Sequence, residues 1–442
     1  MKPIKGDLQT MKEMNRAAIL RLFHRKGTLT RVEIAKLAHL TPTTVSSQVD
    51  ELIREGFIDE LGKTDTTTVG RKAVQLEITR SKGYVIVIGL GGQTFTCALV
   101  NFHGEIIHVN EVRSVQGNDA VGHYLSEAIP RLMKQAGIAE LDRIKGISIV
   151  SPGIIDEQSG TIKLSRGLQL TGFGVKAHLA AAYDCVIEVV NDMNASVFAE
   201  YYYGLNAAYR NVIYVSVEEG IGAGIIINEQ IYAGSNGAAG EIGHTIVDAG
   251  GGMLCQCGNR GCIETVLTVP YLLKRAQMAA REAAGASASA GAGVNAGASA
   301  GTGASASASA GASASAGASA SAGANIAVDV PQQFEDVLAQ YEQGAEWVQP
   351  IMQQAAQVMS QLMATIYNFM SPEMLIIGGW PSRSDAFMQE VKRRLDVFPF
   401  PTETGSDRFV FKSVEQHQIL AGAATWLLQD LFGGVQFSQR YS

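Results

Sequence analysis

The chain has few cysteines and no apolar run of the length that spans a membrane. Only five of its 442 residues are cysteine, too few for the disulfide framework that holds small secreted domains together. No secretory signal pattern opens the sequence, and no run of about 20 apolar residues occurs in it. These absences predict a cytoplasmic protein with no membrane partner, in a reducing compartment where thiols bind metal more often than they pair.

Charged residues are also scarce, at 17% of the chain, and they are unevenly distributed. The formal net charge of −7 argues against a protein that coats nucleic acid over its whole surface. Residues 1–49 nevertheless contain nine lysines and arginines against three acids. A basic head on an acidic body predicts a localised contact with nucleic acid. The length suggests about three domains of roughly 100 to 200 residues each.

Three of the five cysteines lie within eight positions, in a glycine-rich segment that reads EIGHTIVDAGGGMLCQCGNRGCIE from Glu241 to Glu264. Thiolate and imidazole ligands suit the tetrahedral coordination of zinc, and a closed set of four leaves no position for a catalytic water. The sequence therefore predicts one structural Zn²⁺ per chain. Buried thiols beside a core histidine and a disulfide are the alternatives. The predicted ligands are His244, Cys255, Cys257 and Cys262.

A second unusual segment, from Ala283 to Asn325, is almost pure alanine, serine and glycine. It contains no charged and no aromatic residue, so it cannot bury enough apolar area to offset the entropy of the chain. The composition predicts a flexible linker. Alternating alanine and serine can also stack into sheets if chains meet. We assign the tract no function.

Three helices are predicted in the basic head. Apolar residues recur at helical spacing from Met11 to Gly27. Thr30 and Glu33 form a capping box that begins a second helix, and Thr41, followed by proline, begins a third. This order of elements is typical of a helix-turn-helix domain.

The third helix is expected to read DNA. Val45, Val49 and Leu52 face inward, which leaves short polar side chains near the amino-terminal end for a major groove. Alternating apolar residues at 57–58 and 74–78 predict the two strands of a wing. A plain three-helix bundle with a solvated face is the alternative. The predicted DNA-binding residues are Arg31, Thr43, Thr44, Ser47, Gln48, Arg71 and Lys72.

From Tyr84 onward, predicted strands and helices alternate. Apolar runs at 84–89, 97–100 and 147–150 are typical of strands, and 124–136 has helical spacing. This alternation predicts the α/β fold class, with two related lobes and a cleft between them. The predicted domains are a winged helix-turn-helix domain at 1–80, a first lobe at 81–190 completed by a C-terminal helix at 415–435, and a second lobe at 191–414 that contains the zinc site and is interrupted by 283–325.

Several motifs resemble the ROK family, which contains sugar kinases and sugar-responsive repressors. GEIGH followed by CQCGNRGCIE resembles the zinc- and sugar-binding signature of the family, and TVSSQVDEL resembles the amino-terminal domain of ROK repressors. VIYVSVEEGIGAGIIIN is similar to the xylose repressors of the family, with N-acetylglucosamine and glucose regulators as near relatives. The resemblance covers nearly the whole chain outside 283–325. It implies a two-lobed, actin-like (ribonuclease H-like) ROK body behind the winged helix-turn-helix head.

The resemblance also implies a sugar site in the cleft. A sugar hydroxyl both donates and accepts hydrogen bonds, so carboxylates, an amide and an imidazole suit it. From position alone, Asn191 and Asp192 are equally well explained as a helix cap. The residues that match sugar-contacting positions are Asn191, Asp192, Glu241, His244 and Glu264, and Gly153 lies in the loop that closes the site from the first lobe.

Both phosphate loops of the ROK kinases are altered in this sequence. The first reads GLGGQ at 89–93, with Gly89 where the kinases have an acid, and the second has Glu218 and Glu219 where they have Gly-Thr. Two carboxylates beside a triphosphate should repel it by several kcal/mol in a dry site. We therefore expect no enzymatic activity, although Asp192 matches the base of the kinases.

Together these features predict a sugar-responsive repressor of carbohydrate utilisation genes, with xylose as the first candidate effector. It should bind operator DNA as a homodimer or a dimer of dimers and be released when a small sugar enters the cleft. The alternative is an ATP-dependent sugar kinase of the ROK type with a fused regulatory head. A regulator that senses a partner protein is a third possibility.

Overall fold

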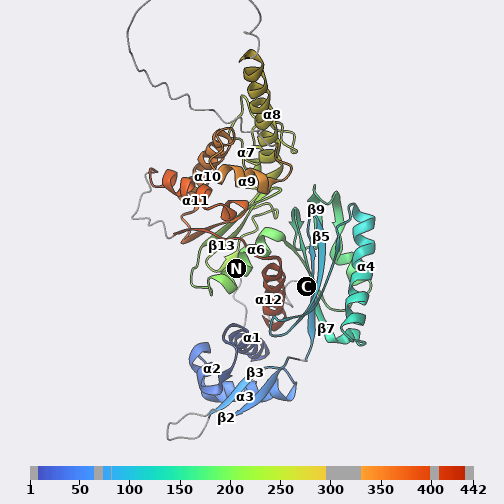
Figure 1. Ribbon diagram of the computed structural model, residues 1–442. Coiled ribbons are helices and arrows are strands. Elements are labelled where there is room, and N and C mark those ends of the chain that lie inside the picture. Colours follow the sequence, from blue (N-terminus) through green and yellow to red (C-terminus); the bar gives the residue numbers. More distant parts are fainter. Residues whose placement is uncertain (1–7, 64–72, 81, 295–329, 399–407, 434–442) are drawn as a thin grey trace, which may run out of the picture.

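A computed structural model describes residues 8–63, 73–80, 82–294, 330–398 and 408–433 of the protein. In these ranges the chain forms a small head with a wing and a larger body with two sheets of five strands each (Figure 1). No helix among the described residues is both long and apolar enough to cross a membrane.

The head is a winged helix-turn-helix, as predicted. The capping box is present: the backbone N–H of Thr30 donates to Glu33 Oε2 at 2.8 Å, and the N–H of Glu33 donates to Thr30 Oγ1 at 3.3 Å. Thr41 caps the third helix by accepting from the N–H of Thr44 at 3.2 Å. The strands pair in the order β1-β3-β2. The elements are α1 (Leu8–Lys26), β1 (Leu29–Thr30), α2 (Arg31–Ala38), α3 (Pro42–Arg54), β2 (Ile58–Lys63) and β3 (Val74–Ile78).

The first lobe is built around a mixed sheet in the order β11-β7-β4-β5-β6. Its strands β4 to β6 form an antiparallel meander, and β7 and β11 add in parallel beside β4. Helix α4 covers one face of the sheet and α12, from the far end of the chain, covers the other. The elements are β4 (Tyr84–Leu90), β5 (Thr94–Asn101), β6 (Ile106–Arg113), α4 (Asn118–Gln135), η1 (Leu141–Arg143), β7 (Ile144–Ser151), α5 (Val175–Ala180), β11 (Val186–Asn191) and α12 (Gln416–Gly433).

A small antiparallel sheet follows β7 and was not predicted. Its strands pair in the order β10-β9-β8, with β8 at Ile154–Asp156, β9 at Thr161–Ser165 and β10 at Leu170–Gly174. These strands are three to five residues long, so they are too short to produce a clear alternation of apolar and polar residues. The sheet lies beside the loop that contains Gly153.

The second lobe repeats the topology of the first. Its strands β12 to β14 form an antiparallel meander, and β15 and β16 add in parallel beside β12. The repeated pattern confirms the predicted α/β fold with two related lobes. The elements are β12 (Val212–Val217), β13 (Ile221–Ile227), β14 (Gln230–Ile231), η3 (Ile242–His244), α7 (Glu264–Leu267), α8 (Val269–Val294), α9 (Phe334–Glu342), α10 (Gln349–Met370), β15 (Met374–Gly379), η4 (Trp380–Arg383), α11 (Asp385–Leu395) and β16 (Phe409–Phe411).

Helix α6 (Asp192–Ala199) and the π-helical turn η2 (Glu200–Gly204) connect the two lobes. Helix α6 packs tightly on the second sheet: a Cβ atom at Gly224 of β13 would lie 2.1 Å from the carbonyl oxygen of Met193. It also packs against α12. In Figure 1 α6 lies above α12, and α1 of the head lies below it.

The start of the Ala/Ser/Gly tract differs from the prediction of a flexible linker. Helix α8 continues through it to Val294, because alanine has the highest helix propensity and a helix that is already nucleated extends at little cost. Residues 295–329 lie outside the described part of the chain.

Candidate functional site

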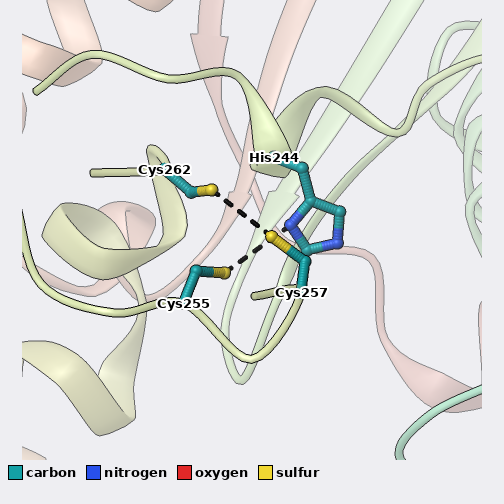
Figure 2. Close-up of side chains that lie close together, drawn as sticks. All are labelled: His244, Cys255, Cys257 and Cys262. Atoms are coloured by element: carbon teal, nitrogen blue, oxygen red, sulfur yellow. Dashed lines mark hydrogen bonds between the residues drawn. The ribbon is translucent and has the colours of Figure 1, made fainter. Parts of the chain in front are cut away.

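The four predicted metal ligands converge at one point of the second lobe (Figure 2). Cys257 Sγ lies 3.6 Å from Cys262 Sγ, and Cys255 Sγ lies 3.8 Å from His244 Nδ1. All four ligand atoms lie within 4.8 Å of one another. A zinc tetrahedron with Zn–S bonds of about 2.3 Å has S···S edges of about 3.8 Å, so this cluster has the dimensions of a zinc site.

Backbone turns that require glycine bring the three cysteines together. The N–H of Cys255 donates to the carbonyl oxygen of Asn259 at 2.8 Å, and the N–H of Gly258 donates to that of Cys255 at 3.0 Å. Gly261 has a φ of +70°, and a Cβ atom there would lie 1.8 Å from the carbonyl oxygen of Asp248. The sequence around the cysteines therefore specifies the loop as well as the ligands.

The thiols have unlike environments. A hydrogen bond from the Asn259 backbone lowers the pKa of Cys257 below its ordinary value, whereas burial raises the pKa of Cys262 to about 12. Burial also raises the pKa of Cys255. A bound divalent cation would reverse the unfavourable shifts, because coordination deprotonates a thiol.

Glu264 links the cysteine cluster to the second sheet. Its Oε2 lies 3.5 Å from His244 Nδ1 and accepts from Cys255 Sγ at 3.6 Å. Its Oε1 accepts from the N–H of Ile221, at the start of β13, at 3.2 Å. The second ring nitrogen of His244 points away from the cysteines (Figure 2). It is therefore available for a ligand outside the cluster.

Asn191 and Gly153 are held together at the carboxyl end of the first sheet. Asn191 Oδ1 accepts from the N–H groups of Met193 and Asn194 at 2.8 and 3.1 Å, so the residue caps α6. Its Nδ2 donates to the carbonyl oxygen of Gly153 at 2.9 Å. Gly153 has a φ of +109°, and a Cβ atom there would lie 2.2 Å from the carbonyl oxygen of Leu164. The helix-cap explanation thus holds for Asn191, and the same side chain fixes the loop of Gly153.

Asp192 is the first residue of α6 and carries a perturbed carboxyl group. Burial raises its pKa to about 6, and the negative charge of Glu241 adds to the increase. The pKa of Glu241 is also raised, mainly by desolvation, while His244 opposes the shift and Glu264 adds to it. These mutual effects connect Asp192, Glu241, His244 and Glu264 electrostatically. Perturbed carboxyls of this kind cluster at functional sites.

Sequence reasoning missed Arg166, which follows β9 in the first lobe. Its positive charge opposes the rise in the pKa of Glu241 and contributes to the lowered pKa of Cys257, and both residues belong to the second lobe. An exposed arginine in a turn carries no sequence pattern that would single it out. Its proximity to the site comes from the antiparallel sheet β8 to β10, which was also not predicted.

On the recognition helix α3, Thr43 and Ser47 are exposed as expected, and Thr44 is half-buried with its Oγ1 2.8 Å from that of Thr41. Gln48 was expected to face DNA but is buried, with 7% of its surface exposed. The reason is helical phase: Gln48 is three residues after Val45, so it lies on the inward stripe with Val49 and Leu52. Arg71 and Lys72 lie outside the described residues.

The burial of Gln48 leads to a stability prediction. Among the described residues, its Oε1 has no hydrogen-bond partner, and an unsatisfied buried acceptor is unfavourable by about 1 to 3 kcal/mol. Gln48→Met, which keeps the shape, is expected to raise the free energy of unfolding by about 1 kcal/mol. Chemical denaturation measures this change. A relaxed base preference in the variant would show instead that Gln48 turns outward on DNA.

Arg31 is held by two acids of the head. Its guanidinium lies 2.8 Å from Asp50 of α3 and 3.2 Å from Glu60 of β2, so it ties the recognition helix to the wing. Arg31→Gln removes this tie, so it is expected to weaken DNA binding. Because the two carboxylates already neutralise the guanidinium, the slope of log affinity against log salt should not change. A direct phosphate contact would instead reduce the slope by about 0.9. Binding isotherms at several salt concentrations decide between the two.

Comparisons with known proteins agree with this architecture. The sequence profile of the ROK family matches residues 85–430, and a profile described as winged helix-turn-helix DNA-binding matches residues 15–59. The chain belongs to the ROK family. The xylose repressor of Caldicellulosiruptor bescii is 32% identical over 270 residues, which cover 61% of this chain and 67% of that protein.

Two further similar proteins are transcriptional regulators. The DNA-binding transcriptional dual regulator NagC of Escherichia coli K12 is 30% identical over 262 residues, covering 59% of this chain and 64% of that protein. A crystal structure of a ROK family transcriptional regulator, a homologue of the E. coli Mlc protein, has a TM-score of 0.74 at 23% identity. That match covers 97% of this chain and 99% of the other, and it shows the shared fold.

The phosphate loops of this ROK chain have other contacts. A Cβ atom at Gly89 would lie 3.0 Å from Gln416 Nε2 of α12, so the end of the Gln416 side chain would have to move slightly to admit an acid there. Glu218 is paired with Arg383 at 3.0 Å, and Arg383 also pairs with Glu335 at 3.3 Å. The expected repulsion from Glu218 is therefore partly neutralised by Arg383.

Proposed function

We propose that this ROK protein is a transcriptional repressor of carbohydrate utilisation genes, whose affinity for operator DNA is lowered by a small sugar bound between its lobes. One observation carries the proposal: a winged helix-turn-helix head is joined to a ROK body that keeps the polar cleft residues but lacks the acid of the first phosphate loop. Similarity to the xylose repressor of C. bescii supports xylose as the first candidate effector.

The proposed sugar site consists of Asn191, Asp192, Glu241, His244, Glu264 and Gly153. In this arrangement Asp192 and Glu241 accept from sugar hydroxyls, and His244 uses the ring nitrogen that points away from the cysteines. Isothermal titration calorimetry against D-xylose, D-glucose and N-acetylglucosamine tests the site. We expect D-xylose to bind most tightly, and a protein that binds none of the three would refute the proposed effector class.

The proposed metal is Zn²⁺, held by the cysteine cluster and by Nδ1 of His244. Three thiolates and one imidazole favour zinc over the hard cations that prefer oxygen ligands. The ion would fix the ring of His244 and the loop that carries Glu241 and Glu264, so it would orient residues of the sugar site. It would leave no open coordination position for chemistry.

On operator DNA, we propose that Thr43, Thr44 and Ser47 of α3 contact the major groove and that Arg71 and Lys72 contact the backbone. A homodimer or dimer of dimers would place two heads on two half-sites, in the cytoplasm, where operator DNA is found. We propose the division of the chain into a head at 1–80, a first lobe at 81–190 with its C-terminal helix at 415–435, and a second lobe at 191–414.

A kinase assay separates this function from its main alternative. With ATP, magnesium and D-xylose or D-glucose, we expect phosphorylation to stay at background, because Gly89 replaces the expected acid and Glu218 lies within the second phosphate loop. A coupled assay of ADP release measures this. Sustained turnover that Asp192→Asn abolishes would establish a sugar kinase.

A further inference from the structure

We propose that the DNA-binding head and the first lobe move as one body, and that the contact between α6 and α12 is the joint through which lobe closure displaces the head. Tyr203 and Thr425 are the positioning residues of this joint. The inference rests on the proposed function, because it explains how a sugar in the cleft would alter operator binding.

The head is seated on the body through one continuous apolar core. Ile19 and Phe23 of α1 belong to the same buried cluster as Leu427 of α12 and Val100 of β5. Helix α1 packs against α12, and Figure 1 shows it below the lower end of that helix. A head attached only by a linker would have a core of its own, separate from that of the lobe. Relative motion of head and first lobe would therefore expose buried apolar surface.

Further contacts fix the head at a second place. Phe57, which follows α3, stacks on Phe102 at the end of β5, with ring centroids 6.4 Å apart and planes inclined by 2°. The side chain of His103 bonds to the carbonyl oxygen of Ile78 in the wing strand β3. Arg80 pairs with Glu105 at 3.3 Å. Contacts at both α1 and the wing prevent rotation about a single attachment.

The recognition helix α3 is expected to move together with α1, because two ion pairs join the two helices. Lys12 Nζ lies 2.7 Å from Glu51 Oε2, and Arg16 Nη1 donates to Glu55 Oε1 at 2.8 Å. Both acids lie at the carboxyl-terminal end of α3, away from the polar side chains proposed to contact DNA. Any displacement of α12 that also moves α1 therefore moves the side chains of α3 that are proposed to contact DNA.

Helices α6 and α12 meet where the two lobes meet. Helix α6 is fixed to the second sheet through Gly224, as described above, and α12 lies on the first sheet, where a Cβ atom at Gly146 would lie 2.8 Å from Leu427 Cδ2. Between the helices, a Cβ atom at Gly422 would lie 2.6 Å from that of Ala199. The two backbones are thus in direct contact, and Asp192 of the proposed sugar site begins the same helix α6.

The π-helical turn η2 is attached to both lobes. Glu200 is 3% exposed and accepts from Lys412 Nζ of the second lobe at 2.8 and 2.9 Å. Three residues later, the hydroxyl of Tyr203 lies 2.6 Å from Oγ1 of Thr425, which is fully buried on α12. Closure of the second lobe moves Glu200 through Lys412 and must therefore act on the bond between Tyr203 and Thr425. A π-helical turn is common at functional sites.

Two substitutions test the joint without changing its shape. Thr425→Val and Tyr203→Phe each remove one of the two hydroxyl groups and so break the hydrogen bond between them. The measured quantity is the ratio of operator Kd with saturating D-xylose to operator Kd without it, by fluorescence anisotropy. We expect this ratio to fall at least threefold in both variants, while operator Kd without sugar and xylose Kd without DNA stay within twofold of wild type. Two control variants should keep the wild-type ratio. Thr425→Ser retains the hydroxyl, and Tyr209→Phe removes a tyrosine hydroxyl outside the joint.

The outcomes distinguish the inference from the proposed function. A wild-type ratio in both variants overturns the joint but leaves the repressor intact. Loss of xylose binding or of operator binding itself in the variants also overturns it, because the residues would then support a site instead of the coupling. A ratio of one in the unmodified protein, with xylose bound, refutes the proposed response and the inference with it.

A distance measurement tests the claim that head and first lobe form one body. Fluorophores on noncanonical residues at Val32 of the head and Lys134 of α4 should show energy transfer that D-xylose does not change. A pair at Val32 and Arg393 of α11, in the second lobe, should show a change. A sugar-dependent change in the first pair, or none in the second, would contradict the single-body motion.

Discussion

Cys257→Ser is expected to release the metal from the protein and to weaken sugar binding in the same step. Cys257 is the ligand whose thiolate is favoured by the Asn259 backbone, and serine is a poor zinc ligand. Elemental analysis of protein purified without added metal should find about one zinc per chain in the wild type and little in the variant. Loss of the ion frees the ring of His244 and the loop of Glu264, so we expect sugar affinity to fall about 10- to 100-fold.

Cys185→Ser is the matched control for this experiment. Cys185 precedes β11 in the first lobe and is not among the four clustered ligands, so its replacement should change neither zinc content nor sugar affinity. Zinc-free Cys257→Ser protein with normal sugar affinity would show that the metal does not orient the sugar site.

Asp192→Ala is expected to abolish the sugar response while leaving operator binding intact. Each hydrogen bond to a charged group contributes about 1.5 to 3 kcal/mol, so the loss of two such bonds to a sugar lowers affinity at least 100-fold. Asp192 lies in the body and not in the head, so the head keeps its contacts. Calorimetry with D-xylose and anisotropy with operator DNA measure the two effects separately. Asp156→Ala, a first-lobe carboxylate paired with Lys163 at 3.6 Å, is the control that should leave both affinities unchanged.

The same carboxyl predicts a pH dependence. The pKa of Asp192 in the folded protein is raised from 3.8 to about 6, so sugar affinity should fall as the pH decreases through 6 and the acceptor becomes protonated. The folded state binds this proton more tightly than the unfolded state, so Asp192 disfavours folding above pH 6, and this effect disappears as the pH falls below 4. Asp192→Asn should remove the step near pH 6 from the binding profile. An unchanged step would assign it to another group.

Local patterns predicted much of the fold. The capping box of Thr30 and Glu33 and the cap at Thr41 depend on neighbours within three residues, so the sequence contains all the information they need. The spacing of the cysteines predicted the cluster for a similar reason, since the three lie in one glycine-rich loop. His244 precedes the cysteines in the same glycine-rich segment, so the same local pattern placed it among the predicted ligands.

Features that depend on tertiary packing were not predicted. Gln48 was assigned to the DNA face because it is polar, although its helical phase places it inside. The pairs of Arg31 with Asp50 and Glu60 and the bond between Tyr203 and Thr425 join residues 19, 29 and 222 positions apart. No local pattern marks such contacts. The continuous core between α1 and α12 likewise joins the two ends of the chain.

The most direct test of the central claim is a titration of operator DNA at several fixed concentrations of D-xylose, matched by a titration of xylose with and without operator. We expect xylose to weaken operator binding and operator to weaken xylose binding by the same factor, because coupling between two sites is reciprocal. A tenfold effect in each direction corresponds to about 1.4 kcal/mol. An operator affinity that stays constant for every sugar that binds the cleft would contradict the account.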